Sequence, residues 1–164
     1  VLEVVEASCT TTTPAATAGQ DVLRVLFVQH SSDQTGSTIS GHLAVEGFRS
    51  AGWDVDVAFG FEGPMIAEYS RLGCRAHVVP HKNWLRGGNL LRSARRISAE
   101  WRNSQSFVAL IDEVRPDVVY VNTLVSLAGV VAARRRRLPC VWHIRELFDD
   151  VGGEMRVHRV HLSV

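Results

Sequence analysis

The sequence predicts an α/β fold in which a parallel sheet is covered by helices on both faces. Short apolar runs alternate with longer segments whose apolar residues recur at the helical period. One short run, residues 117–121, is rich in valine, which is typical of a strand buried on both faces. Parallel strands need crossover connections, which are right-handed, so the pattern indicates a Rossmann-like, doubly wound sheet.

The first strand is predicted at residues 23–28, where the chain is apolar apart from Arg24. Residues 37–51 carry an apolar face at helical spacing and precede Gly52, a residue that commonly ends helices. The apolar run at residues 55–59 then predicts the second strand.

The second helix is predicted from the pair Gly63 and Pro64 to about Leu72, because proline suits the first turn of a helix. Gly73 ends this helix, and residues 76–79 predict the third strand.

A long helical segment follows at residues 89–114, after a loop at residues 80–88 that contains Trp84. We expect an interruption at residues 103–106, where Asn, Ser and Gln favour local backbone hydrogen bonds over helix. Pro116 marks the end of the segment.

The last predicted pair of strands flanks a fourth helix. Residues 117–121 form the fourth strand, residues 124–136 the helix, and residues 138–142 the fifth strand. Thr123 precedes the helix and is a suitable capping residue.

The composition is that of an ordinary globular protein with one domain. The 164 residues are 46% hydrophobic and 21% charged, with a net charge of +1, so nucleic acid is not an expected partner. Cys9, Cys74 and Cys140 are too widely spaced for a zinc pair, and we expect free thiols. The sequence has no apolar stretch of the about 20 residues that span a bilayer and no basic signal start, so we expect a cytoplasmic protein, with peripheral membrane contact left open.

Three regions are expected along the chain. Residues 1–20, rich in Thr and Ala, predict a disordered linker or tail, and residues 21–150 the folded domain. Residues 151–164 predict an incomplete segment with a possible extra strand, so we expect the native chain to be longer.

Polar side chains follow two of the predicted strands, where a parallel sheet places its ligand crevice. His143, Arg145 and Glu146 come after the fifth strand, and Arg could hold a carboxylate, phosphate or sugar hydroxyl. The alternative is an ion pair between Arg145 and Glu146 beside a structural histidine.

The first strand ends in a polar segment that leads through Gly36 and Ser37 into a helix, whose free N–H groups favour an anion. A capping loop in which Thr35 or Ser37 satisfies the helix end is the alternative. Asn122 and Thr123 follow the fourth strand and are equally common as turn or cap residues. The predicted strand ends together suggest one shared cleft.

The run of four arginines at residues 134–137 ends the fourth helix, where cations suit the helix dipole. Anionic lipid headgroups are the functional alternative.

With these residues identified, the chain resembles the amino-terminal domain of retaining glycosyltransferases of the GT-B fold, family 4 or group 1. The similar segments occur in the family's order over residues 23–147: VLFVQHSSDQTGS, GFRSAGWDVDVAF, EGPMIAEYSRLGCRAHVVP, RPDVVYVNT and LPCVWHIRE.

The resemblance implies roles for the strand-end residues. His143 matches a catalytic histidine that lies over the transferred sugar, and Gly36 and Ser37 match the loop that faces the donor phosphates and the acceptor. The other implied substrate-binding residues are Asn122, Thr123, Arg145 and Glu146. It also implies a nucleotide-sugar donor, a polysaccharide, lipid-linked or other acceptor, and no metal or other cofactor.

The resemblance covers the acceptor-binding half of such an enzyme, and the carboxy-terminal, donor-binding domain is missing from this sequence. We therefore expect a glycosyltransferase of cell-envelope polysaccharide synthesis when the two are joined, and an inactive fragment when they are not. The alternative is a non-catalytic Rossmann-like module that binds a ligand or partner. A nucleotide-sugar epimerase is disfavoured because no acid and base pair stands out.

Overall fold

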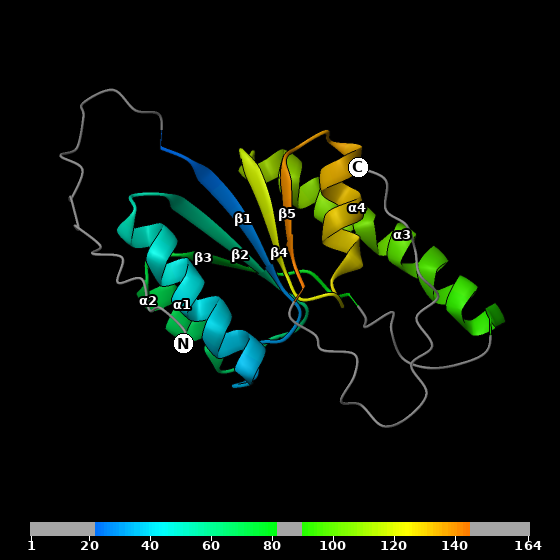
Figure 1. Ribbon diagram of the computed structural model, residues 1–164, viewed down its shortest axis with the longest axis horizontal. Helices are drawn as coiled ribbons and strands as arrows, with labels where there is room; N and C mark the ends of the chain where they lie inside the picture. The colour runs from blue at the N-terminus through cyan, green and yellow to red at the C-terminus, as the bar shows by residue number, and fades with distance from the viewer. Residues whose placement is uncertain (1–21, 82–89, 145–164) are drawn as a thin grey trace, which may run out of the picture.

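Five parallel strands alternate with four helices in the described part of the chain (Figure 1). The computed structural model describes residues 22–81 and 90–144. The elements are β1 (Arg24–Gln29), α1 (Gly36–Ser50), β2 (Asp54–Phe59), α2 (Met65–Arg71), β3 (Arg75–Val78), α3 (Leu90–Val114), β4 (Val118–Asn122), α4 (Leu127–Arg135) and β5 (Cys140–His143).

The strands lie in the order β3-β2-β1-β4-β5. The chain moves outward from β1 to β3 and then crosses back to β4, so its direction along the sheet reverses between β1 and β4. Helices α1 and α2 cover one face, and α3 and α4 cover the other (Figure 1). The predicted Rossmann-like sheet is confirmed.

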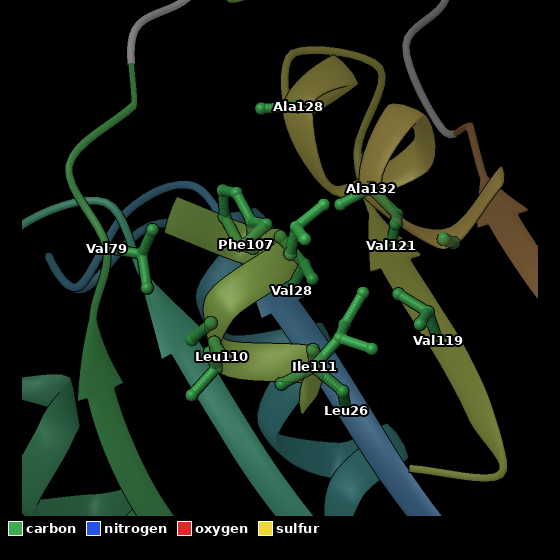
Figure 2. Packing of buried hydrophobic residues seen from close by; sticks show 13 residues of the cluster. Leu26, Val28, Val79, Phe107, Leu110, Ile111, Val119, Val121, Ala128 and Ala132 are labelled. Carbon is green, nitrogen blue, oxygen red and sulfur yellow. The ribbon is translucent and has the colours of Figure 1, made fainter. Parts of the chain in front are cut away.

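Alternate residues of each strand enter two separate cores, because successive side chains point to opposite faces. In β1, Val25 and Phe27 pack on the α1 and α2 side, while Leu26 and Val28 pack on the α3 and α4 side. Figure 2 shows the second core, in which Phe107 of α3 and the small side chains of α4 lie against the strands. Both faces of the central strands are therefore buried, which explains their uninterrupted apolar sequence.

Helix α3 is continuous, so the predicted interruption at residues 103–106 is wrong. The Ser104 hydroxyl donates to the Trp101 carbonyl at 2.6 Å, a bond that the helix accommodates, and accepts one from Arg135 Nη1 at 3.0 Å. The packing of α3 against α4 therefore uses Ser104, a residue whose local propensity disfavours a helix.

Helix α4 begins at Leu127, later than predicted, and Thr123 does not cap it. Ser126 occupies the capping position without a side-chain capping bond. Thr123 has a φ of 90°, outside the extended range of a normal capping residue, and residues 124 and 125 form a turn.

Two of the four arginines at residues 134–137 join α4 to α3. Arg136 pairs with Asp112, and the Arg135 guanidinium lies 4.1 Å from the centre of the Trp101 ring. These contacts give half of the run a structural role.

Among the described residues, Cys74 and Cys140 are free thiols. None of the helices in residues 22–81 and 90–144 combines the length and apolar character needed to cross a bilayer. Residues 1–20, Trp84 and residues 151–164, for which the sequence predicts a tail, a loop residue and a strand, lie outside the described residues.

Candidate functional site

The last residues of three neighbouring strands form a row on the α1 side of the sheet. Gln29 of β1 is in register with Asn122 of β4, which is in register with His143 of β5. The Asn122 amide donates to Gln29 Oε1 at 2.6 Å and to the Ser37 carbonyl at 3.1 Å. The row of Gln29, Asn122 and His143 therefore includes two predicted site residues and is bonded to a third, Ser37.

Helix α1 approaches this row at Gly41. A Cβ atom at Gly41 would lie 2.8 Å from both Gln29 Oε1 and the Tyr69 hydroxyl, and 2.9 Å from Asn122 Nδ2. The Tyr69 hydroxyl itself donates to the Thr38 carbonyl at 2.9 Å. Only glycine lets the helix pass this close. A glycine inside a helical pattern is the one feature of the sequence that could have indicated this close approach.

His143 is held by a residue that the sequence analysis missed. The Tyr120 hydroxyl lies 2.6 Å from His143 Nδ1, and the two rings meet nearly at right angles. Tyr120 lies on the face of β4 that packs toward α1 and α2, and it stacks on Phe27 with ring centres 5.1 Å apart. Its position inside a valine-rich strand suggested only packing.

Thr123 is a strained residue at the end of β4. Its φ of 90° is unusual for a β-branched side chain. Its N–H donates to the His143 carbonyl at 2.9 Å, and its carbonyl accepts from Trp142 Nε1 at 3.0 Å. The last two residues of β5 thus hold the strained backbone in place.

Two histidines, His30 after β1 and His81 after β3, lie on the face of the sheet opposite this row. Their ring centres are 5.3 Å apart. His81 Nδ1 is 2.8 Å from the Val79 carbonyl, which can only accept, so this nitrogen carries the proton and Nε2 faces the Ser126 hydroxyl at 3.3 Å. Burial lowers the pKa of His81 to about 4 and also lowers the pKa of His30. Both rings are therefore neutral at physiological pH.

Three buried polar side-chain atoms of the described residues have no hydrogen-bond partner: Gln29 Nε2, His30 Nδ1 and Thr123 Oγ1. All three belong to the ends of β1 and β4, which flank the point where the chain direction reverses. Ligands of open α/β sheets bind at this kind of position. Buried polar atoms without partners are uncommon, so their concentration here marks a candidate site.

The loop before α1 caps the helix and leaves space around Gly36. Thr35 accepts from the Thr38 N–H, and Thr38 bonds back to the Thr35 N–H, so the capping alternative holds for Thr35. A Cβ atom at Gly36 would have nothing within 4 Å. The start of α1 is thus accessible to an incoming anion, which its remaining amides and dipole would favour.

A groove of about 300 Å³ runs beside this loop between α1 and α2. Gln34, His42 and Glu68 are among its lining residues, and Ile39, Leu43 and Met65 supply apolar walls. Ile39 and Leu43 are 46% and 61% exposed, which is high for large apolar side chains.

Arg145 and Glu146 lie outside the described residues, so their predicted places beside His143 stay predictions. Within the described ranges, no group of three or more His, Cys, Asp or Glu side chains is arranged to hold a metal ion.

A family model, described as a glycosyl transferase 4-like domain, matches residues 35–163, about four fifths of the chain. No curated protein matches the sequence.

Solved structures share the fold at low sequence identity. HepE (Alr3699) of Anabaena, in complex with UDP and glucose, is 17% identical, with a TM-score of 0.53 over 74% of this chain and 29% of that chain. A glycosyltransferase from Rickettsia africae is 12% identical, with a TM-score of 0.52 over 75% of this chain and 30% of that chain. This chain thus spans about three tenths of the length of these two proteins.

The C-terminal domain of the PF1911 hydrogenase from Pyrococcus furiosus is 14% identical, with a TM-score of 0.50 over 74% of this chain and 91% of that chain. The same fold thus occurs in a protein that is named a hydrogenase and not a glycosyltransferase. Identities this low establish the fold alone.

Proposed function

Because the chain belongs to the glycosyl transferase 4-like domain family, we propose that it forms the acceptor-side half of an enzyme that transfers a sugar from a nucleotide-sugar donor. The resemblance to the amino-terminal domain of a family 4, GT-B glycosyltransferase is confirmed. The donor would be held largely by a second, carboxy-terminal domain, and the cleft between the two would contain the row of Gln29, Asn122 and His143.

In the proposed reaction the bond between the sugar C1 and the diphosphate oxygen breaks, and its electron pair stays on the phosphate. The acceptor oxygen bonds to C1 with retention of configuration, and its proton ends on the released phosphate. The start of α1, at Gly36 and Ser37, would face the diphosphate, and no metal ion is needed if this helix and basic side chains stabilise the charge.

His143 would contact the transferred sugar, with Asn122 and Thr123 lining the cleft. Arg145 and Glu146 would complete the cluster on the chain that follows β5. A neutral imidazole both donates and accepts one hydrogen bond, which suits a sugar hydroxyl.

The position of the three unpartnered polar atoms carries the proposal. They flank the reversal point between β1 and β4, beside two predicted site residues and a strained threonine. Buried groups without partners and strained backbone both cost stability, and both concentrate where proteins bind ligands.

The groove between α1 and α2 suits the less polar part of an acceptor. Its apolar walls adjoin the loop that carries Gly36, so a glycan could lie in the cleft while a lipid or other apolar group occupied the groove. A lipid-linked acceptor of cell-envelope polysaccharide synthesis would require a cytoplasmic enzyme at the membrane surface, where Arg134 and Arg137 could meet anionic headgroups.

The test is His143→Ala in the full-length protein that carries this chain. Sugar transfer should slow at least tenfold with the fold intact, because contacts to the transferred sugar act in the chemical step. Val141→Ala is the matched control, since Val141 lies two residues earlier on the same side of β5 and is 48% exposed. Equal turnover of the two variants would remove His143 from the site.

The alternative is a non-catalytic Rossmann-like module that binds a ligand or partner, because structural likeness at 14% identity, as with the PF1911 domain, shows the fold and no activity. A full-length protein that binds a nucleotide sugar or glycan, transfers no sugar to any acceptor and is unaffected by His143→Ala would support that alternative.

A further inference from the structure

We propose that Tyr120 is a positioning residue for His143. Its hydroxyl donates a hydrogen bond to His143 Nδ1 and so keeps the neutral imidazole protonated on Nε2. The importance of this for sugar transfer rests on the proposed function, whereas the protonation pattern itself does not.

The placement of Tyr120 follows from the register of β4 and β5. Tyr120 is directly opposite Val141, and its hydroxyl reaches diagonally to the next residue on the same face, His143, at 2.6 Å. Diagonal neighbours of a sheet are within reach of aromatic side chains.

Two aromatic side chains hold the phenol ring of Tyr120 in place. It stacks on Phe27 with an interplanar angle of 9° and meets Phe48 edge-on with ring centres 5.5 Å apart. With the ring held by both aromatic side chains, the hydroxyl oxygen is fixed beside His143 of β5.

The chemistry of the two groups sets the direction of the bond. A phenol gives up its hydrogen more readily than an imidazole N–H does, and an imidazole nitrogen is the better acceptor. When Nδ1 accepts, the neutral ring must carry its proton on Nε2. Because the two ring nitrogens point away from one another, Nε2–H is directed away from Tyr120 and is free to donate to a substrate hydroxyl.

The segment that follows β3 shows the opposite arrangement. His81 donates from Nδ1 to the Val79 carbonyl and leaves Nε2 as the acceptor. Two histidines at the same edge of the sheet are thus held in opposite tautomers by different partners, a backbone carbonyl and a phenol.

The first test is the ¹⁵N NMR spectrum of the histidine side chains in the full-length protein near neutral pH. We expect His143 with Nε2 protonated in the unmodified protein and a mixture of tautomers in Tyr120→Phe, which keeps the ring and its stacking. Tyr69→Phe is the spectroscopic control, because it loses a hydroxyl bonded to Thr38 and leaves the His143 tautomer as it was. A proton on Nδ1 in the unmodified protein, or an unchanged tautomer in Tyr120→Phe, would overturn the inference.

The second test is a double-mutant cycle on sugar transfer. Tyr120→Phe should lower kcat about three- to tenfold, the equivalent of one hydrogen bond. The same change should have no further effect in a His143→Ala background, because Tyr120 acts through His143. An equal loss in both backgrounds would show a role independent of His143 and overturn the inference. If His143→Ala itself transfers sugar normally, the proposed role of His143 in transfer fails, and the spectra still decide the tautomer.

Discussion

The two edges of the sheet, one at the amino ends of its strands and one at their carboxyl ends, satisfy their polar groups in different ways. At the amino edge, Asp117 accepts from the Arg24 backbone N–H at 2.8 Å and pairs with its guanidinium at 3.3 Å. Asp112 and Arg136 form a second exposed pair at this edge. At the carboxyl edge the described polar groups are buried amides and hydroxyls together with the neutral imidazoles of His30 and His81, and three atoms of the described residues have no partner.

This difference separates polar groups that pair with one another within the fold from polar groups that, under the proposed function, would bind a ligand. Exposed ion pairs are complete without a ligand, and each contributes little because water and salt screen it. Buried groups without partners lower stability, so a natural protein keeps them where they serve binding. The predictions below test this contrast, beginning with the largest expected effect.

The free energy of unfolding should fall by about 3 kcal/mol as the pH drops from 6.5 to about 4, through His81 alone. Burial lowers the pKa of His81 to about 4 in the folded state, so below pH 6.5 the unfolded chain binds the proton first. The stabilisation is complete above pH 6.5 and is lost as the pH falls through the folded-state pKa. Urea titrations across this range measure the loss.

His81→Gln provides the comparison, since glutamine stays neutral and can bond to both the Val79 carbonyl and the Ser126 hydroxyl. Its unfolding free energy should vary less with pH over the same range, and the remaining slope should include a contribution from His30, whose pKa burial also lowers. A slope equal to that of the unmodified protein would contradict the role of His81.

Gly41→Ala should destabilise the fold by about 2 kcal/mol, because the added methyl group meets Gln29, Tyr69 and Asn122 under 3 Å. Gly47→Ala is the matched control in the same helix, where nothing lies within 4 Å of the new Cβ atom. That change should stabilise the protein by about 0.5 to 1 kcal/mol through helix propensity. Thermal or urea unfolding of the two variants should shift in opposite directions, and a stabilised Gly41→Ala would refute the close approach.

Thr123→Gly should raise the free energy of unfolding by about 1 kcal/mol, because glycine accepts a φ of 90° and the unpartnered hydroxyl is removed. The same change should weaken sugar transfer if the strained residue serves the site. Arg115→Gly is the control at the amino edge, where φ is 49°. It should stabilise by about 0.5 kcal/mol without loss of transfer, and a parallel loss in both variants would erase the distinction between the edges.

Asp117→Asn should have the smallest effect. Hydrogen bonds from the Arg24 backbone and side chain lower the pKa of Asp117, so this group stabilises the fold above its unfolded pKa and the contribution is lost only in more acidic solution. About 1 M salt should remove most of the difference between the variant and the unmodified protein. A large, salt-independent loss in unfolding experiments would mean that the amino edge depends on this pair more than its exposure allows.

The sequence analysis succeeded where the governing interactions are local. The order of strands and helices followed from periodicity, and the polar strand ends correctly placed Asn122 and His143 in neighbouring positions. It failed at residues 103–106 and at the start of α4, where contacts between α3 and α4 and the strained Thr123 overrode local preference.

Tyr120, Gly41 and His81 were missed for a related reason. Each has an ordinary place in its own segment, and each acquires its role only from a residue on another element: His143, Gln29 and Ser126 in turn.

The amino-acid sequence by itself determined which segments are strands and which polar residues end them, because side-chain alternation and helical period are properties of a few consecutive residues. The tertiary structure alone decided that Gln29, Asn122 and His143 share one row, that a tyrosine holds the histidine, and that the unpartnered atoms lie at the two strand ends that flank the reversal point. Those relations depend on strand order and register, which arise when segments far apart in the chain pair and bury their apolar faces together.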